Sequence, residues 1–217
     1  MSEASASALR FITTRRSRKP AKPGAWRHLV FVHADVDHGQ DLVRAGKLGA
    51  LADYLATFID RLGRAGADAA VLPAVTPHIC IAQLERRVRL PIISIVDPIK
   101  AELQARRIRR VALLGTIFTM QGSLWGQLEG VEIVKPRPEE MDFIGKAYQR
   151  ILDTQQADPD DAAGLRRIAA DLQHRDGVAA ILLAGTDLAL MFDEANAGFP
   201  AIDVARLHIE AIVERLV

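Results

Sequence analysis

The sequence predicts an α/β protein made of two similar lobes, each with a parallel sheet, related by pseudo-twofold symmetry across a cleft. Two observations predict this fold. Short, continuously apolar runs alternate with amphipathic stretches, which is typical of βαβ units whose strands are covered on both faces. A segment of the first half also recurs in the second half, which indicates two related units.

The bulk composition excludes several classes of protein. The chain has 217 residues, of which 49% are hydrophobic and 25% charged, an ordinary globular mix that can bury a core. The net charge of +1 gives no general reason to expect a nucleic-acid partner. A single cysteine excludes an intramolecular disulfide and a cysteine-rich metal site. Neither a signal peptide nor an apolar run of about 20 residues is found, so we expect a cytoplasmic protein without a membrane partner.

The expected elements follow one another in βαβ order. We expect a basic arm over residues 1–25, a first lobe over 26–104, a second lobe over 105–203 and a closing helix over 204–217. The arm carries a basic run and should be solvated, with phosphate or partner contact as the alternative. The predicted buried strands are 28–33, 69–74, 91–96, 110–115, 131–134 and 179–184. Apolar residues at helical spacing predict helices around 48–62, 143–152, 165–172 and 204–216.

The internal repeat predicts where a ligand would bind. GADAAVLPAVTPH (66–78) and GVAAILLAGTDLA (177–189) each contain a glycine, a buried strand and a small-residue turn with threonine. LPIISIVDPI (90–99) corresponds in the same way to FPAIDVARLH (199–208). Two halves related in this manner would leave a cleft that receives the carboxyl ends of strands from both, where open α/β sheets bind ligands.

Three turns at predicted strand ends carry threonine hydroxyls and free backbone N–H groups. They begin at Ala74, Gly115 and Ala184. Pro77 is well placed as a first helical residue, which makes Thr76 the expected N-cap. Each threonine alone would serve as a helix cap, whereas three such turns in one cleft would form a cradle for a carboxylate or phosphate.

Five segments, in order and spacing, resemble the aspartate/glutamate racemase family. VALLGTIFTM (111–120) is similar to the segment that opens the second lobe of that family, and MDFIGKAYQRIL (141–152) to a helix within it. The segments 65–78 and 179–190 are similar to its two catalytic segments, and PAIDVARLHIEAI (200–212) to its closing pattern. The resemblance covers the chain from about residue 26 to the C-terminus and implies the two-lobed racemase fold.

The resemblance implies chemistry that this chain cannot perform in the same way. In the family, one cysteine from each lobe moves a proton at the α-carbon of a carboxylic acid, without pyridoxal or metal. Here the two cysteine positions fall on Ala74 and Gly185, whose side chains cannot move a proton. The neighbouring asparagine position falls on Val75, and the expected basic residue falls near Gly39 and Gln40.

His78 and Asp187 are the candidate catalytic residues, because each follows one of the two turns and both can titrate. As alternatives, His78 packs beside its helix start and Asp187 is a carboxylate stabilised by a helix dipole. The candidate substrate-binding residues are the backbone and hydroxyl groups of the three turns: Ala74, Val75, Thr76, Thr116, Thr119, Gly185 and Thr186.

Two other groups receive a structural interpretation. His33, Asp35, Asp37 and His38 cluster in one loop, but their spacing is no recognised ligand pattern, so we assign no metal and no cofactor. Cys80 lies beyond the first turn on the expected helix and is interpreted as a small buried hydrophobe.

The preferred function is a cofactor-independent enzyme of racemase ancestry that acts at the α-carbon of a small carboxylic or amino acid. Isomerase, lyase and decarboxylase chemistry all remain open. The alternative is a non-catalytic carboxylate-binding or regulatory protein on the same fold. An ordinary racemase ranks third, since another acid/base pair would have to replace both thiols. We expect a homodimer, by resemblance and because closed twofold assemblies are the commonest.

Overall fold

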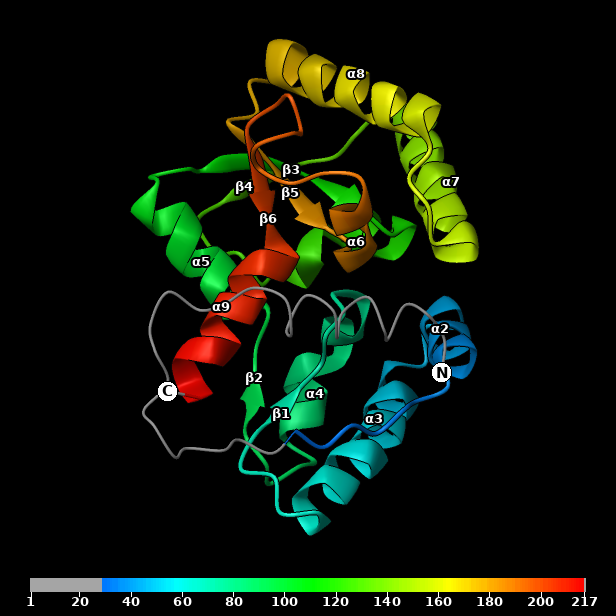
Figure 1. Cartoon of the computed structure of the whole chain (residues 1–217), viewed down its shortest axis with the longest axis vertical. Helices are drawn as coiled ribbons and strands as arrows, with labels where there is room; N and C mark the ends of the chain where they lie inside the picture. The colour runs from blue at the N-terminus through cyan, green and yellow to red at the C-terminus, as the bar shows by residue number, and fades with distance from the viewer. Residues whose placement is uncertain (1–28, 217) are drawn as a thin grey trace.

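A computed structural model describes residues 29–216 of the chain, so the predicted basic arm lies outside the described residues. Within this range the protein is α/β, and every strand pairing is parallel. Figure 1 shows two lobes, one above the other, with the C-terminal helix beside both. The predicted fold class is therefore confirmed. None of the helices in the described range is both long and apolar enough to cross a membrane.

The first lobe has a small sheet of two strands. Its elements are α2 (Val36–Arg44), α3 (Leu48–Arg64), β1 (Ala70–Val71), η1 (Thr76–Cys80), α4 (Ile81–Glu85) and β2 (Ile92–Ile93). The strands β1 and β2 pair in parallel, with Ala70 opposite Ile92. The apolar side of α3 packs into a core of its own with residues of α4 and η1. The helix predicted over 48–62 is thus present.

The second lobe has a four-stranded sheet in the order β4-β3-β5-β6. Its elements are α5 (Val96–Ala105), β3 (Arg110–Gly115), α6 (Ile117–Gly122), η2 (Ser123–Gly126), β4 (Glu132–Val134), α7 (Pro138–Thr154), α8 (Pro159–Asp176), β5 (Ala180–Ala184), η3 (Thr186–Leu190), β6 (Ala201–Asp203) and α9 (Val204–Leu216). The first lobe is smaller by two strands, so the two halves share a plan without being equal in size.

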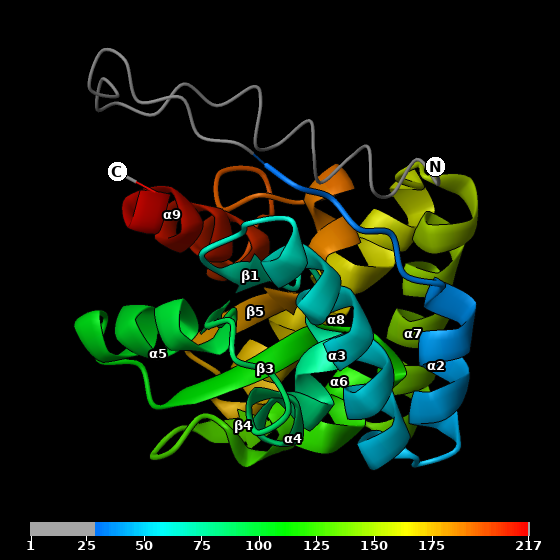
Figure 2. The same cartoon turned by 90° about the horizontal axis from the view of Figure 1, so that it is seen from below.

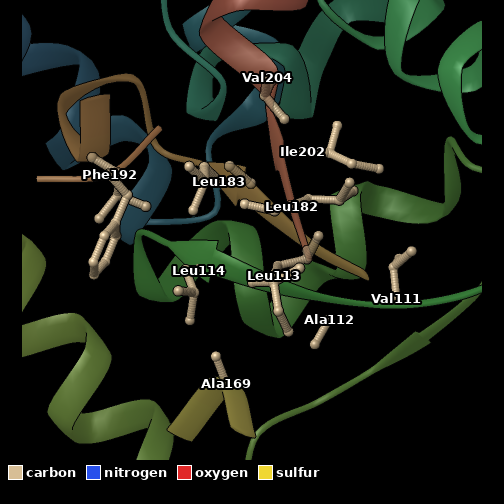
Figure 3. Close-up of a cluster of buried hydrophobic side chains, with 14 of the residues drawn as sticks. Val111, Ala112, Leu113, Leu114, Ala169, Leu182, Leu183, Phe192, Ile202 and Val204 are labelled. Atoms are coloured by element: carbon tan, nitrogen blue, oxygen red, sulfur yellow. The ribbon is translucent and has the colours of Figure 1, made fainter. Parts of the chain in front are cut away.

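The central strands β3 and β5 hold the largest core. Four leucines, two on each strand, are at most 2% exposed, and Figure 3 shows them packed together with residues of β6 and Phe192: Leu113, Leu114, Leu182 and Leu183. Burial of one such side chain contributes about 1.5–3 kcal/mol relative to its exposure. The continuous apolar runs of β3 and β5 follow from this position, because helices cover both faces of the sheet.

Local sequence signals define the ends of α8. Asp158 is the N-cap, and its side chain accepts hydrogen bonds from the backbone N–H groups of Asp160 and Asp161. Pro159 occupies the first helical position, where its missing N–H has no cost. Gly177 ends the helix with φ 65°, a left-handed conformation that glycine adopts without strain.

The strand predicted over 28–33 is wrong for its described part, residues 29–33, which form no strand. Leu29 and Phe31 are 51% and 59% exposed. The small sheet consists of β1 and β2, which pair with each other, so this apolar segment has no strand beside it. Apolar composition favours a strand, but the pairing that completes it is non-local and cannot be read from the segment itself.

The residues just before the predicted boundary between residues 104 and 105 pack with the second lobe. Ile95, Val96, Ile99 and Leu103 lie in the same core as the four-stranded sheet. By its buried face, α5 therefore belongs with the second lobe. The closing helix α9 turns back toward the first lobe, where the ring Nε2 of His208 donates to the carbonyl oxygen of Ile93 over 3.0 Å. Figure 1 shows α9 running from the end of β6 down toward β2, and Figure 2 shows the same helix from below.

Candidate functional site

A chain of three threonine hydroxyls joins the two lobes. The hydroxyl oxygen of Thr76, in η1 of the first lobe, lies 3.1 Å from that of Thr116, which follows β3 of the second lobe. The Thr116 oxygen lies 3.0 Å from that of Thr119. The structure thus brings together three of the predicted substrate-binding residues, one from the first lobe and two from the second.

The register of the large sheet places the second and third turns side by side. Gly115 of β3 pairs with Ala184 of β5, and these are the last residues of their strands. Thr116 and Gly185 therefore leave the sheet at neighbouring points. A Cβ atom at Gly115 would lie only 2.6 Å from the carbonyl oxygen of Ala184. Glycine is needed at this position so that the two strand ends can approach each other.

Of the expected caps, Thr116 is confirmed and Thr76 is wrong. Thr76 is the first residue of η1 rather than its N-cap, which is Val75, and η1 has no side-chain cap. The hydroxyl of Thr76 is directed across to Thr116 instead. Thr116 is the N-cap of α6 and accepts from the backbone N–H of Thr119 over 3.2 Å. The middle hydroxyl of the chain therefore belongs to a residue that is itself a helix cap.

His78 is fully buried, and both of its ring nitrogens are hydrogen-bonded to backbone groups. Nε2 accepts from the backbone N–H of Ile95 (3.4 Å), so Nδ1 carries the proton and donates to the carbonyl oxygen of Ala74 (2.9 Å). Burial lowers the pKa of His78 to about 4, with a further contribution from His208, whose ring centre lies 6.4 Å away. His78 is therefore neutral at pH 7. Neither nitrogen is left over for a substrate or for Asp187.

Asp187 is held by a tyrosine on the helix that the sequence predicts around 143–152. The hydroxyl of Tyr148, on α7, donates to Oδ2 of Asp187 over 2.9 Å. Tyr148 is 6% exposed, whereas Asp187 is partly exposed. Burial first, and the Asp187 carboxylate next, raise the pKa of Tyr148 well above its ordinary value. The phenol is therefore a neutral hydrogen-bond donor.

The ring of Tyr148 fills the space that a side chain at position 185 would need. A Cβ atom built on Gly185 would lie 2.3 Å from Cε2, 2.7 Å from Cζ and 2.8 Å from the hydroxyl oxygen of Tyr148. Two features of the sequence could have indicated this contact: a large aromatic residue on the helix, and glycine at the position that the resemblance aligns with a cysteine. Neither predicts the contact alone, because the sequence does not show that α7 lies against this turn.

Cys80 has the structural character that the sequence indicated. Its side chain is buried, and the thiol donates to the carbonyl oxygen of Pro77 over 3.3 Å. Burial raises its pKa to about 11. Thiolate is the reactive form of cysteine, so this side chain is unreactive at neutral pH.

The 33–40 segment borders a cavity of about 850 Å³ between the lobes. The cavity is lined by residues of this segment, of α3 and of the C-terminal part of α7. Asp35 in this segment is the N-cap of α2 and accepts from the backbone N–H of His38 over 3.1 Å. Across the described residues, no group of three or more His, Cys, Asp or Glu side chains is placed to hold one metal ion.

Comparison with solved structures identifies the same fold in three proteins. A candidate Asp/Glu racemase from Yersinia pestis is 23% identical, with a TM-score of 0.82 and coverage of 99% of this chain and 94% of the other. An aspartate racemase homologue from Pyrococcus horikoshii is also 23% identical, with a TM-score of 0.80 and coverage of 99% and 95%. For the aspartate racemase of Picrophilus torridus the identity is 19%, the TM-score 0.73 and the coverage 99% and 90%.

The sequence identities to these structures are low and support the fold alone. A family model gives stronger evidence of which family the chain belongs to. The model that describes Asp/Glu/hydantoin racemases matches residues 3–212, nearly the whole length. Together with the two parallel-sheet lobes and the ordered turns at their strand ends, this match shows that the chain belongs to the Asp/Glu/hydantoin racemase family.

Proposed function

We propose that the protein is a cofactor-independent enzyme that acts at the α-carbon of a small carboxylic or amino acid, with a carboxylate in place of the family's thiols. The observation that carries this proposal is the arrangement of the three turns. Thr76, Thr116 and Thr119 form one hydroxyl chain, and the turn that bears Asp187 leaves the sheet beside Thr116. Donors for a carboxylate and one titratable group thus come from neighbouring points of the cleft.

In the proposed reaction the hydroxyls and backbone N–H groups bind the substrate carboxylate, and Asp187 takes up a proton. The C–H bond at the α-carbon breaks, its electron pair is delocalised into the bound carboxylate, and an O–H bond forms on Asp187. Hydrogen bonds to the developing charge stabilise it more than the ground state, which is how such donors accelerate proton abstraction. Transfer of the proton to a different atom of the delocalised anion, or departure of another group, would complete an isomerase or lyase cycle, whereas its return to the same face of the α-carbon would only regenerate the substrate. A decarboxylase cycle would start with loss of CO2 from the α-carbon, and protonated Asp187 would then supply the proton to that carbon.

A specific observation also supports the alternative, a non-catalytic carboxylate-binding protein. Ala74 and Gly185 bring no titratable group to the two thiol positions, and His78 has both ring nitrogens engaged. A protein that keeps the cradle and loses the acid/base pair would still bind acids. The two candidates therefore predict the same ligands and differ in turnover.

A panel of D- and L-amino acids and dicarboxylates separates the two candidates. Proton NMR in D2O would follow α-proton exchange, inversion and cleavage, while calorimetry would follow binding. Exchange without inversion is expected if one lobe alone transfers the proton. Saturable binding with no chemical change would favour the binding protein, and neither binding nor turnover would contradict both.

Variants of the turns would then assign the roles. Asp187→Ala should lower turnover by about 10²–10⁴, the usual size for a lost proton-transfer group. Thr76→Val and Thr116→Val should mainly raise the Michaelis constant, because each removes a hydrogen bond to a charged group worth about 1.5–3 kcal/mol. If His78 and Asp187 act together as acid and base, as the sequence predicts, His78→Ala should lower turnover by the same factor as Asp187→Ala. Full turnover in a folded His78 variant would leave Asp187 as the acid/base group.

We also propose that the protein is a homodimer, the commonest closed assembly. Light scattering at micromolar concentration should give twice the mass of the chain, and a monomer mass would contradict the proposal.

A further inference from the structure

The second lobe carries a replacement for the side chain that position 185 lacks. The hydroxyl oxygen of Tyr148 lies 2.8 Å from the place that the Cβ of residue 185 would occupy. A side chain at 185 and the Tyr148 ring therefore exclude each other. The glycine leaves a gap at the end of β5, and a residue from a different element, α7, fills it.

The hydrogen bonds of this cluster show what the phenol does there. Tyr148 has one hydroxyl proton, and it is donated to Oδ2 of Asp187. Oδ1 of Asp187 accepts no hydrogen bond from any other side chain or backbone group in the described range, although Asp187 itself is partly exposed. One oxygen of the carboxylate is thus held by the tyrosine, and the other is free to face solvent or a ligand.

We propose that Tyr148 is the positioning residue of this site: its ring replaces the missing side chain at 185, and its hydroxyl fixes Asp187 so that Oδ1 becomes the proton-transfer atom of the second lobe. The part of this proposal that concerns proton transfer rests on the proposed function, whereas the positioning does not. The phenol itself is buried and stays neutral, so it acts through Asp187 rather than on the substrate.

The other titratable side chains of the turns do not compete for this role. His78 uses both ring nitrogens in hydrogen bonds to backbone groups, and Cys80 donates its thiol proton to the carbonyl oxygen of Pro77. Ala74 has no titratable group. The proton would therefore leave and return on the face of the substrate that meets the second lobe. Exchange with retention, or a single protonation after a bond is cleaved, fits this arrangement.

A double-mutant cycle in turnover tests whether Tyr148 acts through Asp187. The four proteins are wild type, Tyr148→Phe, Asp187→Asn and the double variant. Phenylalanine keeps the ring and removes only the hydroxyl. We expect Tyr148→Phe to lower kcat about tenfold, with KM nearly unchanged, because Asp187 loses the hydrogen bond that orients its carboxylate.

In the Asp187→Asn background the same change should cause no further loss of kcat. Equal losses in both backgrounds would overturn the proposal, as would wild-type kcat in Tyr148→Phe. Tyr54→Phe is the matched control. The chain has only two tyrosines, and the hydroxyl of Tyr54 bonds the backbone of Asp35 instead, so its removal should not lower kcat tenfold.

A second measurement does not depend on turnover. With tyrosine labelled at Cζ, carbon NMR gives two signals, assigned by the two phenylalanine variants. Tyr148 should remain neutral at a pH well above the ordinary pKa of tyrosine, and Asp187→Asn should bring its ionisation to lower pH. An unchanged Tyr148 titration in Asp187→Asn would refute the hydrogen bond. If no acid is turned over but this shift is seen, the proposed function fails and the positioning of Asp187 stands.

Discussion

Replacing Gly185 by alanine tests the space-filling role of Tyr148 directly. The backbone of Gly185 has φ −142° and ψ 119°, an extended conformation that any residue adopts. Alanine would therefore bring no backbone strain, and glycine-to-alanine changes at such positions typically stabilise by about 0.4–1 kcal/mol through the unfolded state. The Tyr148 ring is the obstacle, because the new Cβ would lie 2.3 Å from one of its carbons.

The magnitude follows from two costs. The ring must move by about 1 Å or more within a packed core, and overpacking of this kind costs about 1–3 kcal/mol. Displacement of the phenol also weakens its hydrogen bond to Asp187, and bonds to charged groups contribute about 1.5–3 kcal/mol. We therefore expect Gly185→Ala to lower the free energy of unfolding by about 2–5 kcal/mol. For a chain of this size that corresponds to a decrease of roughly 5–15 °C in Tm.

The sign should reverse when the ring is absent. Tyr148→Ala alone should be destabilising, since removal of a buried aromatic ring costs about 3–5 kcal/mol. In that background, Gly185→Ala should be neutral or slightly stabilising. Urea unfolding followed by circular dichroism gives all four free energies, and their non-additivity measures the contact. An equal loss from Gly185→Ala in both backgrounds would show that the ring does not occupy this space.

The remaining predictions concern the strand ends, the buried histidine and the cysteine. Gly115→Ala should lower the free energy of unfolding by about 3 kcal/mol, the upper end of the range for overpacking, as measured by thermal unfolding. The new Cβ would clash with the backbone of Ala184, and no side-chain rotation can relieve that clash. The lowered pKa of His78, about 4, means that the unfolded chain takes up a proton below pH 6.5 and the native protein does not. Stability should therefore fall by about 3 kcal/mol between pH 6.5 and 4, and a shallower slope is expected in His78→Gln; an unchanged slope would contradict the assignment. Cys80→Ser should keep turnover within a few-fold, and complete loss in a folded variant would show that the thiol takes part.

Sequence patterns predicted the second lobe well, because its strands are buried on both faces and their apolar runs are unambiguous. The runs 110–115 and 179–184 became β3 and β5, and the helix predicted around 165–172 lies within α8. The segment 28–33 was mispredicted because it has the same composition as a buried strand. Its state depends on whether another strand lies beside it, and a local pattern carries no such information.

The site shows the same division between local and non-local information. The turns were predicted from local signals, and the structure brings Thr76, Thr116 and Thr119 together. The orientation of His78 depends on Ile95, which lies 17 residues away, and the contact of Tyr148 with Gly185 joins segments 37 residues apart. A side chain's role at a strand end is set by what packs on it from other elements, which sequence spacing does not specify.

The two positions that the resemblance aligns with the family's cysteines, Ala74 and Gly185, have different surroundings. In the first lobe, the backbone carbonyl oxygen of Ala74 accepts a hydrogen bond from His78, whose side chain is fully buried. In the second lobe, Gly185 makes room for Tyr148, which in turn holds a partly exposed carboxylate two residues along the same turn. Under the proposed function, the buried His78 leaves the turn of the first lobe without an acid/base group, whereas Tyr148 holds Asp187 at the turn of the second lobe. Proton transfer on one face of the substrate would follow from this asymmetry.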